Sequence, residues 1–379
     1  MSIERNGNAS LQRLTGCILT PGGWIRGLIE FASRIWSIDG VSVEHPEAHD
    51  QIILPGFIDL HVHGGGGSDV MEGAAAIEMI AATHARHGTT GFLATTVTAE
   101  KPELRAALTA VGTVMKQRKA GCASILGVHL EGPYINSAKL GAQPDACRKA
   151  DIEEVKFLHS LAPIRVMTIA PELVGHLEFI KQLNELGIIT QCGHSAGTYE
   201  EGVAALSAGI KGFTHLFNAM SPFQHRAPGM VGAALAHASY SEIIPDLLHV
   251  HPGAILAAVR AIPHLYCVTD STAAAGMPDG EYKLGSHVVT KCMGGVRLAD
   301  GTLAGSSLTM DQALRNLVRI GLDLSDASRR LSTFPADYLG ITDRGRLAHS
   351  AFADLVVLTP ALNLKKVFVE GEEIEVVNA

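Results

Sequence analysis

Imidazole and carboxylate side chains follow several short apolar runs of this chain. His61 and His63 stand in "DLHVHGGGG", Glu131 in "VHLEGPY", His194 in "QCGHSAGTYEE" and His215 in "FTHLFNAM". Imidazole nitrogens and carboxylate oxygens bind Zn²⁺ at about 2.0–2.1 Å, and three such ligands with one open position make a catalytic site. Asp270 in "CVTDST" is a candidate base for a water molecule activated there. Each residue alone could be an ordinary buried or turn residue, but the set predicts metal-assisted hydrolysis.

The pair His61 and His63 allows three interpretations. Residues i and i+2 of a strand face the same side, so both rings could ligate one ion. The glycines that follow could instead cradle a phosphate or form a pliable turn. Neither a Walker lysine nor a GxGxxG motif after a strand accompanies them. The stretch therefore predicts an auxiliary metal site followed by a turn.

Polar loops supply weaker candidates. Arg226 in "FQHRAPGMVG" is suited to bidentate contact with a phosphate or a carboxylate. His249 and His251 repeat the H-x-H spacing, and "LAGSSLTMDQA" offers backbone amides at the start of a helix. On their chemistry alone, all of these are equally well explained as surface-loop residues.

Strand-like and helical segments alternate through the middle of the chain. Apolar runs such as "TTGFLATTV", "ASILGVHLEG", "IRVMTIAPE" and "IIPDLLHVH" are separated by alanine-rich segments such as "AAAIEMIAATHARHG" and "EEGVAALSAG". We count about eight runs, which predicts a (β/α)8 barrel, with a doubly wound open sheet as the alternative. Nearly all runs end in polar residues, among them Thr95, Thr96 and His129. A barrel would gather these residues on one face, so it is the simpler account.

The two ends of the chain have a different pattern. Residues 1–53 and 344–379 contain strand-like runs divided by turn residues, with no sustained helical period. Chain termini commonly lie close together. The ends therefore predict one small β domain beside a catalytic domain over residues 54–343.

Composition restricts the setting and the partners. The chain has 379 residues, 47% of them hydrophobic, and a formal net charge of −8. An acidic chain is a poor match for the nucleic-acid backbone, so the expected partner is a small molecule. The 6 cysteines contain no CxxC pair, which favours a reducing compartment. With no signal peptide and no membrane-spanning stretch in the sequence, the expected location is the cytoplasm, away from a membrane.

Seven ordered motifs carry a family resemblance. They are "PGFIDLHVHG", "HLEGPY", "GHSAGTYEEG", "THLFNAM", "HRAPGMVGA", "VTDSTAAAGMPDG" and "LAGSSLTMDQA". In this order they resemble N-acetylglucosamine-6-phosphate deacetylases of the amidohydrolase superfamily, from about residue 50 to the C-terminus. The resemblance implies a dimer with a metal-dependent barrel and a small β-sandwich domain. The implied reaction hydrolyses the acetamide of an N-acetyl amino sugar 6-phosphate.

The resemblance also implies roles for individual residues. Glu131, His194 and His215 would hold the main ion, expected to be zinc, and a second ion could bind at His61 and His63. Asp270 would be the general acid and base. Asn218, Ala219, Arg226 and His249 would contact the sugar phosphate, aided by a cation of the neighbouring subunit. The implied lining of the sugar is Ala142, Leu303, Ala304 and Gly305. Gln143 stands where some members have a histidine that polarises the substrate carbonyl.

Three other functions remain open from the sequence. The same chemistry could act on N-acetylgalactosamine 6-phosphate, because the motifs do not separate the two epimers. Another amidohydrolase, such as a cyclic-amide hydrolase, would more often use a carbamylated lysine, and no lysine ends an apolar run here. A catalytically silent metal-binding scaffold would have little need of Asp270.

Overall fold

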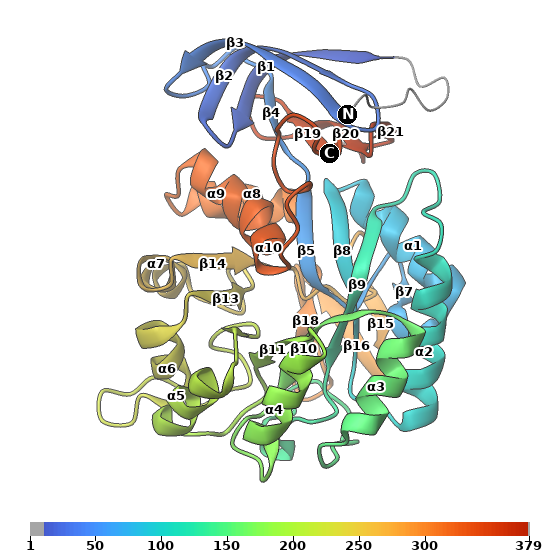
Figure 1. Cartoon of the computed structure of the whole chain (residues 1–379), viewed down its shortest axis with the longest axis vertical. Helices are drawn as coiled ribbons and strands as arrows, with labels where there is room; N and C mark the ends of the chain where they lie inside the picture. The colour runs from blue at the N-terminus through green and yellow to red at the C-terminus, as the bar shows by residue number, and fades with distance from the viewer. Residues whose placement is uncertain (1–10, 378–379) are drawn as a thin grey trace.

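The computed structural model describes residues 11–377, and its larger part is built on parallel strands surrounded by helices (Figure 1). A six-stranded and a two-stranded parallel sheet form it, and the strands are β5 (Phe57–Val62), β8 (Thr89–Thr96), β9 (Ser124–Glu131), β10 (Ile164–Ile169), β11 (Ile189–Cys192), β12 (Gly212–Phe213), β13 (Tyr240–Ile243) and β14 (His264–Cys267). The segment after β14 closes the barrel, because the Asp270 amide donates to the His61 carbonyl at 2.9 Å. Between β12 and β13, the Leu216 amide donates to the Glu242 carbonyl at 2.9 Å. The predicted (β/α)8 barrel is confirmed.

Helices surround the barrel. They are α1 (Ala74–Ala85), α2 (Lys101–Val114), α3 (Ile152–Leu161), α4 (His176–Glu185), α5 (Tyr199–Ala208), α6 (Gly229–His237), α7 (Pro252–Ala261), α8 (Met310–Arg319), α9 (Leu324–Leu331) and α10 (Thr333–Tyr338), with 3₁₀ turns η1 (Val70–Glu72) and η2 (Ser137–Lys139). Local sequence sets the ends of α5, where Thr198 and Glu201 form a capping box and Gly209 ends the helix. Within residues 11–377, no helix has the length and apolar character needed to cross a membrane.

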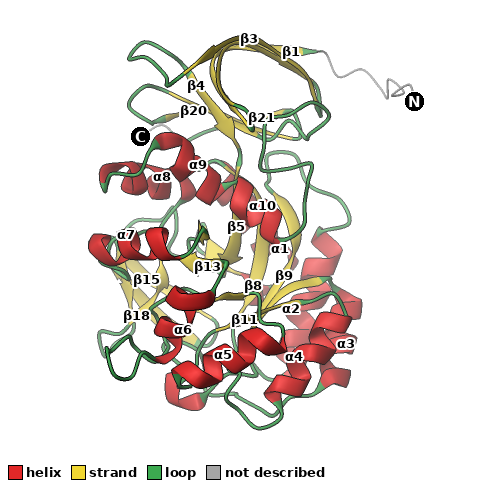
Figure 2. Cartoon of the chain, turned by 60° about the vertical axis from the view of Figure 1, so that its left-hand side comes forward, coloured by secondary structure: helices red, strands yellow, loops and turns green. Residues whose placement is uncertain are grey.

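Strands from both chain ends build one separate sheet. Its seven strands run in the order β21-β20-β19-β4-β1-β2-β3. They are β1 (Gln12–Thr20), β2 (Gly23–Phe31), β3 (Ile35–Val43), β4 (Ile52–Pro55), β19 (Leu355–Leu358), β20 (Leu364–Val369) and β21 (Glu372–Ile374). Figure 2 shows this sheet curling on itself beyond one end of the barrel. Ile18, Ile29 and Phe31 pack inside it against Leu355 and Phe368, so the predicted small β domain from both chain ends is confirmed.

A buried ion pair joins the terminal sheet to the barrel. Arg344 forms salt bridges with Asp354 and with Glu370. Glu370 also accepts a hydrogen bond at 3.0 Å from the hydroxyl of Ser124, the first residue of β9. The Arg344 side chain is 10% exposed and that of Asp354 is 2% exposed. The two parts of the chain are therefore linked through charged groups largely removed from water.

Two features differ from the expectation. An antiparallel four-stranded sheet that was not predicted lies between β14 and α8, and consists of β15 (Gly280–Leu284), β16 (His287–Cys292), β17 (Gly295–Arg297) and β18 (Leu303–Ser306). The run "IIPDLLHVH" was interpreted as a strand that ends in His249 and His251. That interpretation is wrong, because β13 ends at Ile243 and the rest of the run is a loop before α7.

The glycines after His63 form a tight hairpin. β6 (Gly64–Gly65) and β7 (Ser68–Asp69) pair antiparallel around Gly66 and Gly67. Both central residues have positive φ, +63° and +82°, as a two-residue type I′ turn requires. A Cβ atom at Gly64 would lie 2.5 Å from the Ala273 amide nitrogen. The prediction of a turn is confirmed.

Candidate active site

A cleft of about 240 Å³ opens at the carboxyl ends of the barrel strands. In (β/α)8 enzymes this end carries the active site. The ends of β9, β11, β12 and β14 supply its polar floor, and the β15–β18 sheet supplies one wall. The residues that line it are His63, Glu131, Gly141, Ala142, Gln143, His194, His215, Asn218, Ala219, His249, Asp270, Leu284, Thr302, Leu303 and Gly305.

Glu131, His194 and His215 bring three donor atoms together at one point of the cleft. Glu131 Oε1 lies 3.1 Å from Nε2 of His194 and 3.1 Å from Nε2 of His215. The two imidazole nitrogens are themselves 3.1 Å apart. Tetrahedral ligands at about 2.0–2.1 Å from one Zn²⁺ are about 3.3 Å from each other. The three atoms are therefore spaced for a single ion.

The backbone holds one ring nitrogen of His194, which leaves the other nitrogen for the cluster. Nδ1 of His194 lies 2.8 Å from the carbonyl oxygen of Lys139. A carbonyl can only accept, so Nδ1 carries the proton of the neutral ring. The lone pair of Nε2 then points at the Glu131 carboxylate. With a divalent ion bound, this lone pair and the carboxylate oxygen 3.1 Å away would both point at the ion. This donor set therefore fits a divalent metal ion.

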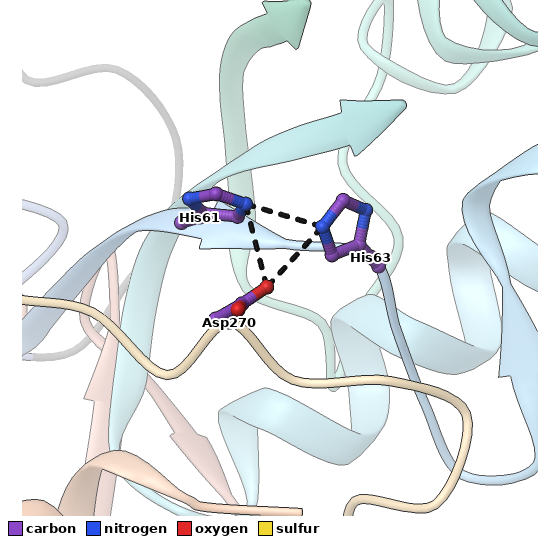
Figure 3. A group of neighbouring side chains, drawn as sticks. All are labelled: His61, His63 and Asp270. Carbon is purple, nitrogen blue, oxygen red and sulfur yellow. Dashed lines mark hydrogen bonds and ion pairs between the residues drawn. The ribbon is translucent and has the colours of Figure 1, made fainter. Parts of the chain in front are cut away.

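His61, His63 and Asp270 form a second cluster (Figure 3). Nε2 of His63 is 3.1 Å from Nε2 of His61 and 3.2 Å from Oδ1 of Asp270. The distance between His61 Nε2 and Asp270 Oδ1 is 3.4 Å. Glu131 turns its other oxygen, Oε2, toward this cluster, 3.2 Å from Nε2 of His63. A single carboxylate thus faces both clusters, as a ligand that bridges two ions would.

The charges of the site attract a cation. Burial opposes ionisation of Glu131, but the nearby charge of His61 outweighs it and holds the pKa of Glu131 well below its ordinary value. Burial alone would lower the pKa of His63, yet its hydrogen bonds to Asp270 and Glu131 raise that pKa to about 9. Without a metal ion, protons on the imidazole rings supply the positive charge that faces the carboxylates. Metal binding would release these protons.

Three of these residues have a left-handed backbone, which side chains other than glycine rarely adopt. The φ angle is +48° at His194, +30° at His215 and +49° at Asp270. Hydrogen bonds hold the strained peptides, since the His194 carbonyl accepts from the Asn136 amide at 3.0 Å. Likewise the Asp270 carbonyl accepts from the Ser306 amide at 2.7 Å. Backbone strain of this kind concentrates at functional sites.

Gln143 contacts the carboxylate that faces both clusters. Its amide nitrogen donates to Oε2 of Glu131, and its amide oxygen accepts from the Thr98 backbone amide at 2.6 Å. Both ends of the amide are engaged, so Gln143 fixes the orientation of Glu131. The family resemblance places Gln143 where some members have a histidine that polarises the substrate carbonyl. In this structure, Gln143 instead donates a hydrogen bond to the Glu131 carboxylate.

Sequence reasoning missed Glu242 of β13. This residue is fully buried, and its Oε2 lies 3.1 Å from Nδ1 of His61. A lone glutamate in "YSEII" gives no sign of that contact, because an isolated glutamate more often faces solvent. The one available signal was its place in an apolar stretch, where a charged group needs a partner.

His129 and His251 have other partners. Nδ1 of His129 donates to the Leu60 carbonyl at 2.9 Å, and Nε2 lies 2.8 Å from the Thr168 hydroxyl. Burial lowers the pKa of His129 to about 4, so the ring is a neutral part of the barrel interior. His251 instead caps α7, where its Nδ1 accepts from the Gly253 amide at 3.1 Å.

Most of the residues expected to bind substrate meet at the cleft. Those that line it are Ala142, Asn218, Ala219, His249, Leu303 and Gly305. Ala304 is fully buried behind this wall. Arg226 is exposed and lies in a separate groove with Thr198 and Pro228. The cleft of one chain therefore does not contain the Arg226 guanidinium.

Asp246 prepares His249 for contact with an anion. Oδ2 of Asp246 lies 2.7 Å from Nδ1 of His249, which leaves Nε2 for the cleft. Burial would lower the pKa of His249, but the hydrogen bond and charge of Asp246 raise it. The ring is thereby favoured in its positive form. Asp246 was not predicted as part of the site.

A closed barrel with histidine and carboxylate clusters at its carboxyl end defines a metal-dependent hydrolase of the amidohydrolase class, and residues 52–374 match the amidohydrolase family. N-acetylgalactosamine-6-phosphate deacetylase of Escherichia coli O157:H7 is 36% identical over 94% of this chain and 97% of its own length. N-acetylglucosamine-6-phosphate deacetylase of Lysinibacillus sphaericus is 36% identical over 88% of each chain.

A solved structure agrees with these relatives. The N-acetyl-D-glucosamine-6-phosphate deacetylase of Mycobacterium smegmatis, an aspartate-to-alanine mutant in complex with N-acetyl-D-glucosamine-6-phosphate, superimposes with a TM-score of 0.89. It is 33% identical, and the match covers 98% of this chain and 100% of that one. The chain belongs to the N-acetylglucosamine-6-phosphate deacetylase family of amidohydrolases and is a hydrolase that acts on an amide bond.

Proposed function

We propose that the protein hydrolyses the acetamide of N-acetyl-D-glucosamine 6-phosphate to D-glucosamine 6-phosphate and acetate, a step of amino-sugar catabolism. The observation that carries this proposal is the convergence of Glu131, His194 and His215 beside Asp270 in an open cleft. The Lysinibacillus sphaericus relative is an N-acetylglucosamine-6-phosphate deacetylase, and the Mycobacterium smegmatis enzyme is in complex with N-acetyl-D-glucosamine-6-phosphate. Both support this choice of substrate.

For the cofactor we propose zinc, because the donors of the site are imidazole nitrogens and carboxylate oxygens. Glu131, His194 and His215 would hold the main ion. His61, His63 and Asp270 would hold a second ion, with Glu131 shared between the two. A divalent ion bound there would lower the pKa of a water molecule toward about 7 and would polarise the acetyl carbonyl.

Asp270 is the proposed general base and acid. Its carboxylate takes a proton from the attacking water while the water oxygen bonds to the acetyl carbon. The same carboxyl group then gives this proton to the amide nitrogen as the C–N bond breaks. The amino sugar leaves as an amine, and acetic acid leaves and ionises. The Asp270 side chain is only 11% exposed, and its backbone is bonded to His61 and Ser306, so the carboxylate is held in position.

The sugar would lie against Ala142, Asn218, Ala219, Leu303 and Gly305, with Ala304 supporting this wall from behind. His249 is the proposed phosphate contact, because Asp246 favours its positive form. The part of the chain that the structure describes places no lysine or arginine in the wall of this cleft. We therefore propose a homodimer in which a cation of the second subunit completes the phosphate site. The exposed Arg226 is the candidate.

The proposed compartment is the cytoplasm. All six cysteines are free, and four of them are buried. Free cysteines throughout a chain are typical of proteins in a reducing environment.

A second candidate substrate is N-acetyl-D-galactosamine 6-phosphate. The Escherichia coli O157:H7 relative that carries this name is as similar to the chain as the glucosamine enzymes are, at 36% identity over 94% of the chain. The two sugars differ only in the configuration at C4, and both present the same acetamide to the clusters.

The test is acetate release by the purified protein loaded with Zn²⁺. The substrates are the gluco and galacto 6-phosphates and unphosphorylated N-acetylglucosamine. We expect the gluco phosphate to have the highest kcat/KM of the three sugars. Loss of the phosphate should raise KM, because the contact to His249 is lost. No acetate from any of these sugars would overturn the proposal, and preference for the galacto sugar would favour the second candidate.

A further inference from the structure

The four histidines that face the two clusters differ in what holds their second nitrogen. Nδ1 of His61 lies 3.1 Å from the Glu242 carboxylate, and Nδ1 of His194 lies 2.8 Å from a backbone carbonyl. For His63 and His215, no partner for the buried Nδ1 atom exists among residues 11–377. His61 is therefore the ring that a carboxylate orients.

Glu242 reaches both clusters through a single oxygen atom. Its Oε2 accepts from Nδ1 of His61 and also from the backbone amide of His215, at 3.2 Å. Its Oε1 accepts from the Tyr266 hydroxyl at 3.3 Å. The side chain is 0% exposed. In the described part of the chain, the basic groups within 4.0 Å of this carboxylate are the rings of His61 and His129. The buried charge of Glu242 is thus directed at the metal clusters.

Glu242 could instead be a ligand of a third ion, since His61, His129 and Glu242 also lie close together. The hydrogen bonds exclude this. Both nitrogens of His129 are engaged, Nδ1 with the Leu60 carbonyl at 2.9 Å and Nε2 with the Thr168 hydroxyl at 2.8 Å. His129 Nδ1 is also 4.0 Å from the Glu242 carboxylate. Glu242 is therefore not a ligand of a third ion, and its carboxylate contacts the metal clusters through the ring of His61.

We propose that Glu242 is the positioning residue of the second cluster: it accepts the Nδ1 proton of His61, and so directs the Nε2 lone pair toward His63 and Asp270. The inference rests on the two-ion centre put forward under the proposed function. A histidine ligand whose other nitrogen donates to a carboxylate is fixed in one tautomer and is a stronger base. Loss of such a partner typically weakens metal binding about 10–100-fold.

The pattern of contacts predicts which ion responds. Glu242 touches the ring of His61 but only the backbone of His215, and it touches neither Glu131 nor His194. Replacing Glu242 should therefore weaken the ion at His61, His63 and Asp270. The ion at Glu131, His194 and His215 should be retained.

The experiment is a zinc titration of the metal-stripped full-length protein, with competition by a chelating dye and metal analysis after dialysis. Glu242→Ala removes the acceptor, and Glu242→Gln keeps an oxygen acceptor of the same size but removes the charge. Ser241→Ala is the matched control, because Ser241 is the preceding buried residue of β13 and its hydroxyl bonds to the Phe213 carbonyl at 2.9 Å, away from His61.

We expect two ions in the wild type and in Ser241→Ala. In Glu242→Ala one ion should bind 10–100-fold more weakly, and in Glu242→Gln the same ion should be weakened less. If Glu242→Ala does not fold, weaker binding of one ion by Glu242→Gln still supports the inference. Wild-type binding of both ions by Glu242→Gln and Glu242→Ala would overturn it. Equal loss of both ions in Glu242→Ala and Ser241→Ala would do the same, since it would indicate a general packing role.

A wild type that binds a single ion would also overturn this inference. The proposed deacetylation would not be affected by that result, because acetate release is measured separately. Conversely, failure to release acetate from any sugar would leave the metal titration free to support or reject the role of Glu242.

Discussion

Replacing Asp270 by asparagine tests the proposed proton transfer. Asparagine has the same shape and keeps one side-chain oxygen, and Oδ1 of Asp270 lies 3.2 Å from Nε2 of His63. The cleft wall should therefore be unchanged, and the ions should still find an oxygen there. What is lost is a carboxylate that can accept a proton from water and return it to the amine.

A positioned general acid and base contributes about 10²–10⁴-fold to a rate. At about 1.36 kcal/mol per factor of ten, Asp270→Asn should raise the activation free energy by about 3–5 kcal/mol. The whole effect should fall on kcat. KM should stay within about threefold, since the sugar is held by other residues.

The assay is continuous acetate release from N-acetylglucosamine 6-phosphate, with the zinc content of each sample measured in parallel. Asp50→Asn is a suitable control. Asp50 is also nearly buried, at 7% exposure, but it pairs with Arg26 at 2.8 Å in the terminal sheet. That control should keep wild-type kcat. An Asp270→Asn enzyme with kcat within tenfold of wild type and full zinc content would refute the assigned role.

Three further perturbations have expected outcomes. Glu131→Gln should weaken both ions by more than about 100-fold, because its two oxygens face different clusters; full zinc occupancy after dialysis would contradict this. Arg344→Ala should lower the free energy of unfolding by about 3–5 kcal/mol, because it leaves the carboxylate of Asp354 buried and unpaired; an unchanged urea midpoint would refute it. Burial lowers the pKa of His84 to about 4 from 6.5, so the unfolded chain binds a proton first and stability falls as the pH drops from 6.5 toward 4. His84→Gln should remove about 1.5 kcal/mol of the loss between pH 6.5 and pH 5, and an identical pH dependence in urea unfolding would count against it.

The barrel could be predicted because its strands are buried on both faces. All eight residues of β8 are buried, so the segment contains no charged residue and lacks the polar–apolar alternation of a strand with one face in water. The run at 243–251 misled because its apolar residues resemble a strand. In the structure the carboxylate of Asp246 accepts from the amides of Leu248 and His249 at 2.9 Å, which makes a turn. Side-chain bonds of this kind leave no periodic signal in a sequence.

The candidate ligands could be predicted because they are polar residues at the ends of apolar runs. Barrel topology alone then brings Glu131, His194 and His215 together, although they are far apart in the sequence. Glu242 and Gln143 could not be found in this way. One lies inside a strand and the other in a loop, and each acts through a ligand by a hydrogen bond that depends on three-dimensional position.

The left-handed backbone of His194, His215 and Asp270 limits how the protein can evolve. Each such residue costs about 1–3 kcal/mol of stability, and glycine at the same position would remove that cost. Selection for heat resistance alone would therefore favour loss of the side chains on which the proposed chemistry depends. A lineage that moves to higher temperature must find its added stability elsewhere, for example in the terminal sheet. Inactive descendants of this protein should carry glycine or asparagine at these three positions first.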